Sequence, residues 1–132
     1  MHTKKVVLDS SFISALINCN DVHYERAHRH LITCDDSQFL IPIVVRLELV
    51  LLPHALKSKE MHTALQEFFS SFPFETVWID ESFLSSYEHT FSLLNCRIKP
   101  FDLTVVTSAI KYKAKLLTFD EKLLKYWDIF TR

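Results

Sequence analysis

The 132-residue chain contains no glycine. Glycine is the residue best suited to positive φ, so every turn and helix end must form without it. Its absence also removes the glycine-rich loops that hold phosphate groups. P-loop and dinucleotide-binding sites of the usual kind are therefore excluded.

Net charge, paired cysteines and long apolar segments are also scarce. Fifteen Lys and Arg against sixteen Asp and Glu leave a formal charge of −1, which argues against a histone-like DNA binder but not against a local basic groove. Cys19, Cys34 and Cys96 are odd in number and widely spaced, so we interpret them as free thiols. The apolar runs are too short for a signal peptide or a transmembrane helix. We therefore expect a cytoplasmic protein that does not enter the membrane.

The chain has the composition of one globular domain, with 48% hydrophobic and 23% charged residues. Short apolar runs predict strands at 4–9, 38–42, 74–79 and 115–119, with a final edge strand at 128–131. Helical patterns occupy 10–18, 21–34, 43–58, 60–72, 81–95 and 101–113, and the third of these is expected to bend or break at Pro53. This alternation predicts a three-layer α/β/α sandwich with a mainly parallel sheet of about five strands.

Three aspartates lie at the predicted boundaries between strands and helices. Asp9 ends the first strand, Asp120 ends the fourth, and Asp102 opens the helix that leads into the fourth. Parallel sheets place their ligand sites outside the carboxyl ends of the strands. A crossover helix begins at that same edge, so we expect the three carboxylates to converge there.

Glu48 is the fourth candidate, because it lies in a helix where nearly every other position is apolar. A carboxylate there is costly to desolvate unless it is paired, and Arg46 points to a different side of the helix. Four clustered carboxylates without a cation would repel one another and raise their pKa values. Mg²⁺ and Mn²⁺ prefer oxygen ligands, so Asp9, Glu48, Asp102 and Asp120 together predict a metal site.

Each acid also has a simpler explanation. Asp9 could cap the helix at 10–18, and Asp102 could favour its helix N-terminus through the dipole and the free N–H groups. Asp120 could be a turn residue, and Glu48 could pair with a distant Lys or Arg. Their joint position at one edge favours the metal site over four separate explanations.

Four stretches, in this order, resemble the PIN-domain family, and within it the VapC-type toxins of toxin–antitoxin pairs: VVLDSSFISALI, HYERAHRHL, VVRLELV and FDLTVVTSAIKYKAKLLTFDEKLL. The resemblance implies one PIN-like domain over residues 1–132 with a five-stranded parallel sheet between helices. It implies an Mg²⁺- or Mn²⁺-dependent endoribonuclease, with an RNA substrate, a cognate antitoxin protein and a homodimeric assembly. The family's catalytic and metal-binding acids map onto Asp9, Glu48, Asp102 and Asp120, and its substrate-positioning hydroxyl residues map onto Ser11 and Thr118.

The chain departs from the family pattern in two places. The glycine often found between the last helix and strand is replaced in Lys113-Ala114-Lys115, which is tolerable if Lys113 ends the helix without positive φ. Residues 55–98 match only in pattern.

Alternative functions are an RNA-processing nuclease outside a toxin pair and a non-catalytic RNA- or protein-binding module. A haloacid-dehalogenase phosphatase would need Asp-x-Asp at the first strand, where the chain has Asp9-Ser10-Ser11, and a response-regulator receiver also fits less well.

Three further clusters have both a functional and an ordinary interpretation. His23, His28 and His30 suggest a metal site. On a helix, however, only His23 and His30 lie near one face, and no third ligand is placed with that pair, so a solvated helix face is favoured. The lysines near the C-terminus are interpreted as ordinary surface or as RNA phosphate contacts; they are Lys111, Lys113, Lys115, Lys122 and Lys125. The aromatic stretch 68–74 is expected in the core rather than as a base-stacking platform, and a part in a dimer interface stays open as an alternative.

Overall fold

The computed structural model describes residues 4–94 and 97–131. Its strands are β1 (Lys5–Leu8), β2 (Gln38–Pro42), β3 (Glu75–Val77) and β4 (Lys115–Leu117). Its helices are α1 (Ser10–Ile17), α2 (Tyr24–Thr33), α3 (Ile43–Leu56), α4 (Lys59–Ser71), α5 (Glu81–Leu94), α6 (Pro100–Lys111) and α7 (Glu121–Thr131). Strands and helices alternate as the sequence predicts.

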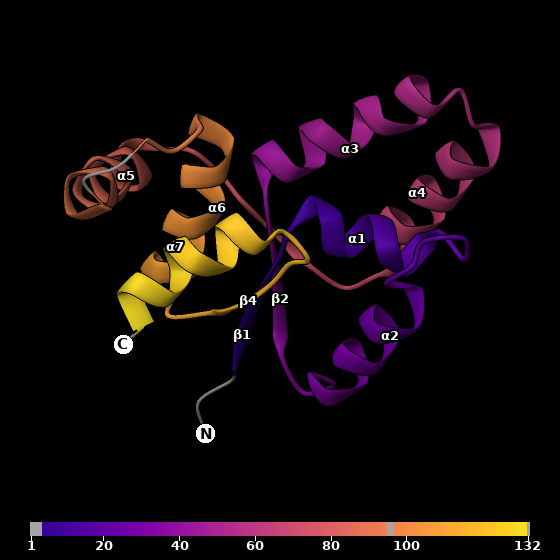
Figure 1. Ribbon diagram of the computed structural model, residues 1–132, viewed down its shortest axis with the longest axis horizontal. Helices are drawn as coiled ribbons and strands as arrows, with labels where there is room; N and C mark the ends of the chain where they lie inside the picture. The colour runs from indigo at the N-terminus through magenta and orange to yellow at the C-terminus, as the bar shows by residue number, and fades with distance from the viewer. Residues whose placement is uncertain (1–3, 95–96, 132) are drawn as a thin grey trace.

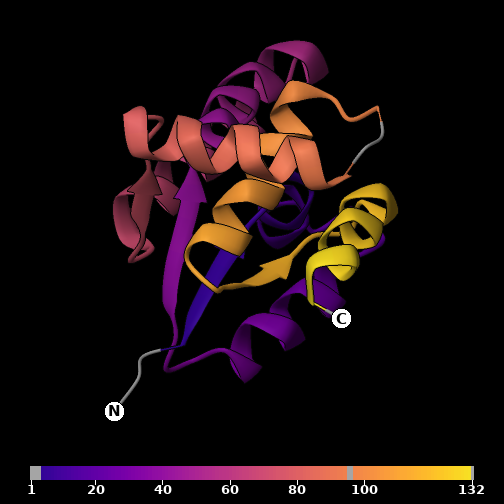
Figure 2. The ribbon, with the colours of Figure 1, turned by 90° about the vertical axis from the view of Figure 1, so that its left-hand side faces the viewer.

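The four strands form a parallel sheet in the order β3-β2-β1-β4. β1 is central, and Val7 lies opposite Leu40 on one side and Leu116 on the other. Figures 1 and 2 show α5, α6 and α7 on one side of the sheet and α1, α2 and α4 on the other, with α3 across its carboxyl end. The predicted three-layer α/β/α architecture is confirmed, with four strands in the described residues instead of about five.

Apolar side chains from both helical layers meet on the sheet. Val6, Val7 and Leu8 of β1 are almost fully buried, as expected for a central strand covered on both faces. Phe12 and Ile13 of α1 are buried in the same cluster. The central strand and the start of α1 are thus fixed by dense packing, and Asp9 lies between them.

The C-terminal segment differs from the prediction of an edge strand at 128–131. These residues belong to α7, which runs from Glu121 to Thr131. Leu123, Tyr126, Trp127 and Phe130 recur at helical spacing, and all four pack in or against the core. The spacing of the apolar side chains therefore favours a helix, and β4 forms one edge of the sheet.

Two other boundaries also differ. α3 continues through Pro53 to Leu56 rather than breaking there. β3 ends at Val77, two residues earlier than predicted, and the next two side chains, Trp78 and Ile79, are exposed. Pairing with β2 covers only Glu75 to Val77, so the strand pattern of the sequence extends beyond the paired residues.

The condition set for replacing the family's glycine, that Lys113 ends the helix without positive φ, is not met. Lys113 has φ 52° and Lys57 has φ 51°, each just after the end of a helix. The N–H of Ala114 donates to the carbonyl of Ala109, and the N–H of Lys113 donates to that of Ile110. This is the hydrogen-bond pattern of a Schellman C-cap, with lysine where glycine is usual.

Cys19 and Cys34 are free thiols, as predicted, and Cys96 lies outside the described residues. Within the ranges that the structure covers, no helix combines the length and the apolar character needed to cross a bilayer.

Candidate active site

Asp9 follows β1 directly and is held by two hydroxyl groups. Thr118 donates to Asp9 Oδ2 at 2.7 Å, and Ser11 donates to the same oxygen at 2.9 Å. The two hydroxyl oxygens are themselves 3.0 Å apart. The carboxylate is almost fully buried and makes no capping hydrogen bond to α1. The capping explanation therefore fails for Asp9, and both predicted hydroxyl residues lie against it.

The hydroxyls of Ser11 and Thr118 also fix the chain after β4. The N–H of Phe119 donates to Ser11 Oγ and the N–H of Asp120 donates to Thr118 Oγ1, both at 3.0 Å. The bond to Ser11 joins the β1–α1 turn to the β4–α7 turn across the sheet edge, and the bond to Thr118 is local to the β4–α7 turn. The backbone that carries Asp120 is consequently held beside Asp9.

Glu48 is half-buried on α3, and it faces the same edge. Burial raises the pKa of Glu48, and the Asp9 charge raises it further, with smaller contributions from Asp102 and Asp120. The hydrogen bond from Ser10 Oγ, at 3.4 Å, lowers the pKa but does not offset the other effects. No cation contributes to this shift among the described residues, so the distant ion pair considered for Glu48 is not found.

Asp102 lies in the first turn of α6, after Pro100 at the helix start. Burial is the largest cause of its raised pKa, followed by the charges of Asp120 and Asp9; Lys99 and Lys122 lower the pKa by less. The start of α6 carries no side-chain capping bond. Asp102 therefore sits at a helix N-terminus without acting as its cap.

Asp120 does have the ordinary role that the sequence allowed. Its Oδ1 accepts from the N–H of Lys122 at 2.9 Å and from that of Leu123 at 3.4 Å, at the start of α7. Its charge also raises the pKa values of Glu48 and Asp102. Asp120 thus stabilises a helix start and belongs to the acidic cluster.

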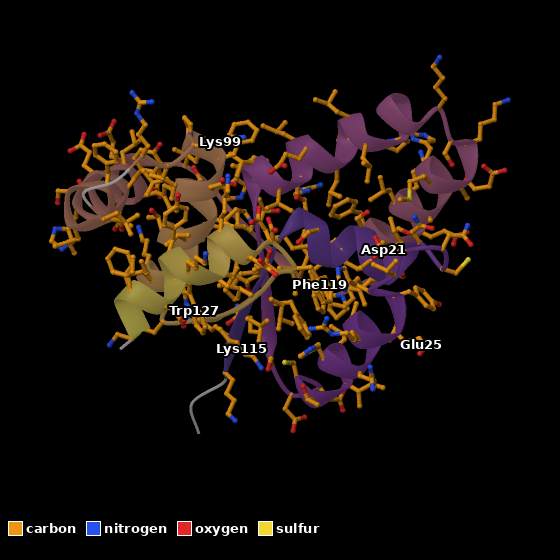
Figure 3. The ribbon with its side chains drawn as sticks, viewed as in Figure 1. Asp21, Glu25, Lys99, Lys115, Phe119 and Trp127 are labelled. Atoms are coloured by element: carbon orange, nitrogen blue, oxygen red, sulfur yellow. The ribbon has the colours of Figure 1, made fainter. Side chains whose placement is uncertain are left out.

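An open cleft of about 1330 Å³ holds three of the four acids, Glu48, Asp102 and Asp120, in its lining. Phe91, Phe101 and Tyr126 form apolar parts of its wall, and Arg97, Lys99 and Lys122 line it as cations. Figure 3 shows Lys99 at the start of α6, above the turn that carries Phe119. The four predicted acids thus converge at one sheet edge, with positive side chains around them.

The carboxylate oxygens of the cluster are the ligand type that a hard divalent cation prefers, although the side chains lie too far apart to coordinate one ion together. Among the residues that the structure covers, no three Asp, Glu, His or Cys side chains are close enough together to hold a metal ion. The four carboxylates nevertheless interact electrostatically and raise pKa values in the cluster, as expected for acids that face one another without a cation. Asp9 Oδ1 accepts no hydrogen bond from the described residues.

The other sequence clusters have structural roles. His28 contacts the carbonyl of Leu16 through Nε2 at 2.9 Å, and His23 stacks on Phe119 with ring centres 4.3 Å apart. No group of three possible metal ligands occurs in the part of the chain that the structure describes. His28 and His30 are exposed, as a solvated helix face predicts, and His23 is partly covered. In the aromatic stretch, Phe69 and Phe74 pack against the core as predicted, and both contact the Arg46 guanidinium.

Two features of the site were not predicted from the sequence. Ser10 donates to Glu48, a contact between positions 38 residues apart. Phe119 lines the cleft and stacks with both His23 and Phe12. The position of Ser10 beside Asp9 was the available signal for the first. No sequence pattern indicated that α2 packs against the residue before Asp120.

Three solved structures share this fold at low sequence identity. VapBC2 from Rickettsia felis, solved with a DNA fragment from its promoter, has a TM-score of 0.67 at 20% identity, covering 92% of each chain. Mycobacterium tuberculosis VapC20, described as a toxin that cleaves the sarcin–ricin loop, has a TM-score of 0.65 at 20% identity, covering 91% of this chain and 93% of that one. VapBC-1 from nontypeable Haemophilus influenzae has a TM-score of 0.67 at 16% identity, covering 96% of this chain and 94% of that one.

No curated protein matches the chain significantly. The PIN domain family model matches residues 6–127, a range that includes all four acids and both hydroxyl residues of the site. The strand order, the carboxylates at the carboxyl edge and this match agree with one another. The chain belongs to the PIN domain family.

Proposed function

We propose that this protein is a metal-dependent endoribonuclease and the toxin of a VapBC-type toxin–antitoxin pair. One observation carries the proposal: four acids from separate segments meet at one edge, and repulsion among them raises the pKa values of Glu48 and Asp102. A protein with no use for this cluster would be more stable without it. A divalent cation converts the repulsion into binding energy.

Mg²⁺ or Mn²⁺ fits this set of donors, because every candidate ligand is a carboxylate oxygen. Asp9, Glu48 and Asp102 would hold the ion, and Asp120 would act through its second oxygen or through water. A cation bound there supplies charge stabilisation for phosphodiester hydrolysis and lowers the pKa of water.

The surrounding side chains prepare the carboxylates for that role. Ser11 and Thr118 bind one oxygen of Asp9, which fixes its orientation and leaves Oδ1 as the ligand atom. Ser10 orients Glu48 in the same way. Lys99 and Lys122 line the cleft and attract a phosphate group towards the acids. Their placement supports a polyanionic substrate.

The direct test is cleavage of single-stranded RNA and of an RNA hairpin by the purified protein. We expect cleavage with millimolar Mg²⁺ or Mn²⁺ and none after EDTA is added. Re-addition of the ion should restore it, which separates metal dependence from denaturation. A preparation that binds RNA but never cuts it would favour the non-catalytic alternative instead.

An antitoxin or a second copy of the chain requires an apolar surface. Leu47, Val50 and Leu51 lie along one side of α3 and are exposed by 52%, 70% and 66%. Exposed apolar stripes of this kind are typical of binding surfaces, and two of the similar structures are VapBC complexes. Growth arrest on expression, relieved by a small protein from the adjacent gene, would support the toxin assignment. Cleavage without growth arrest or such a gene would favour an RNA-processing nuclease.

A further inference from the structure

A second cavity, of about 400 Å³, lies beside the acidic cleft between α2 and α7 and along β4. We name it the α2–α7 groove and define it by Arg26, His30, Lys115, Phe119, Glu121 and Trp127. Phe119 and Glu121 also line the acidic cleft, so the two cavities adjoin. The groove carries the basic side chains Arg26, His30 and Lys115 against one acid, which gives it the opposite electrostatic character to the cluster.

Arg26 is the basic residue best placed in this groove. Its guanidinium lies 5.4 Å from the centre of the Phe119 ring, and its side chain is exposed. It donates no hydrogen bond to another described residue. The aromatic ring therefore holds the cation in place while its N–H donors remain open to a ligand, and a guanidinium matches a phosphate group geometrically.

The basic surface continues away from the cleft. A neighbouring cavity of about 480 Å³ shares Lys115 and Trp127 with the groove and adds Lys113. Figure 3 shows Lys99 above and Lys115 below the turn that carries Phe119, with Trp127 on α7. Positive side chains thus line both the acidic cleft and the groove that adjoins it.

We propose that single-stranded RNA runs from the acidic cleft over Phe119 into the α2–α7 groove, where Arg26 and Lys115 bind its backbone phosphates. This rests on the proposed ribonuclease function and assigns the path of the substrate. Clustered carboxylates repel a phosphate backbone, so affinity must come from cations beside them. The groove has the volume of a small-molecule site, and we assign it to a single strand.

The test measures RNA binding separately from cleavage. A fluorescent single-stranded RNA of about twelve nucleotides is titrated with Asp102→Asn protein, by anisotropy and at several salt concentrations, with or without Arg26→Gln and Lys115→Gln. The matched control carries Arg29→Gln on α2 and Lys125→Gln on α7, which remove two exposed charges from the helices beside the groove but outside the linings of cleft and groove. Arg26→Lys, which keeps the charge, tests for rescue.

We expect the groove pair to weaken binding roughly three- to tenfold and to lower the slope of log K against log salt by about 1.4, since each phosphate contact on a single strand contributes about 0.7. In the active protein the same pair should raise KM and leave kcat near the wild-type value. The control pair should change neither quantity, and Arg26→Lys should bind nearly as well as the parent.

Three results would overturn the proposal. If the Arg26→Gln/Lys115→Gln protein and the control double variant bind RNA equally well, while wild type still cleaves RNA, the proposed RNA path is wrong and the proposed nuclease function stands. Displacement of the RNA by poly-L-glutamate at equal charge would show that the groove accepts acidic peptides instead. Wild-type protein that neither cuts nor binds RNA would remove the proposed function together with the path.

Discussion

Thr118 donates a 2.7 Å hydrogen bond to Asp9 across 109 positions of the chain. The same hydroxyl oxygen accepts from the N–H of Asp120. One small side chain therefore joins the end of β1 to the turn before α7. The geometry of the acidic edge depends on this link, and its removal should affect both stability and activity.

Thr118→Val removes the hydroxyl while keeping a branched side chain. Asp9 Oδ2 loses a donor and the Asp120 N–H loses its acceptor, so we expect a loss of about 1–3 kcal/mol of stability. Cleavage should fall roughly 10–100-fold, as is typical when a partner of a ligand is lost. Thr118→Ser keeps the hydroxyl and should stay near wild type in denaturant titrations and in RNA cleavage. Equal losses in both variants would point to packing instead.

Glu48→Gln should stabilise the metal-free protein. The pKa of Glu48 is raised in the folded state, so the folded protein holds this proton more tightly than the unfolded chain does. The contribution of protonated Glu48 to the free energy of unfolding is complete below about pH 4 and is lost as pH rises through the folded-state pKa. We therefore expect the Tm difference between Glu48→Gln and wild type, measured in EDTA, to be small near pH 4 and to reach a few degrees by pH 7. A difference independent of pH would exclude this account.

Divalent cations should make wild type more stable than it is in EDTA, and so offset the advantage of Glu48→Gln. Mg²⁺ or Mn²⁺ binds the folded state, where the carboxylates are assembled, so millimolar concentrations should raise the wild-type Tm. Asp9→Asn should lose most of this gain because it removes a ligand while keeping a similar shape. High NaCl serves as the control for general screening. A wild-type Tm that does not respond to either ion would make the metal site doubtful.

Lys113→Gly should stabilise the protein, although it removes a charged side chain. Lys113 has φ 52° at a Schellman C-cap, where a non-glycine residue costs about 1 kcal/mol or more. Glycine removes that cost but adds freedom to the unfolded chain, which leaves a net gain of about 0.5–1 kcal/mol. Lys113→Ala is the control, since it removes the charge and keeps the Cβ; it should show no gain in urea unfolding. A loss of stability in Lys113→Gly would contradict this reading of the helix end.

The sequence predicted the parts of the fold that depend on local patterns. Alternating apolar strands and amphipathic helices determined the α/β class, and the strand ends determined where Asp9 and Asp120 would lie. Glu48 was recognised because an isolated carboxylate in an apolar helix needs an explanation. These features follow from burial and from the geometry of parallel sheets.

The errors arose where a short local pattern fits more than one structure or where distant residues meet. Residues 128–131 read as a strand, yet the core contacts of Trp127 and Phe130 fit a helix. Lys113 adopts positive φ because the chain must turn at the end of α6 and offers no glycine there. The stacking of His23 and Arg26 on Phe119 joins residues about 95 positions apart, and no local pattern could indicate it.

The central claim is that the acidic edge catalyses RNA cleavage, and Asp102→Asn tests it most directly. Asn keeps the shape of the side chain, and α6 has no side-chain cap to lose, so the fold should remain intact. Asp80→Asn is the matched control: Asp80 also opens a helix after a strand, and its Oδ1 accepts from the N–H of Phe83 at 2.8 Å. With Mg²⁺ or Mn²⁺ present, we predict that Asp102→Asn lowers the single-turnover rate of RNA cleavage roughly 100- to 1,000-fold, while Asp80→Asn cleaves at the wild-type rate. Wild-type cleavage by a folded Asp102→Asn protein would contradict the account.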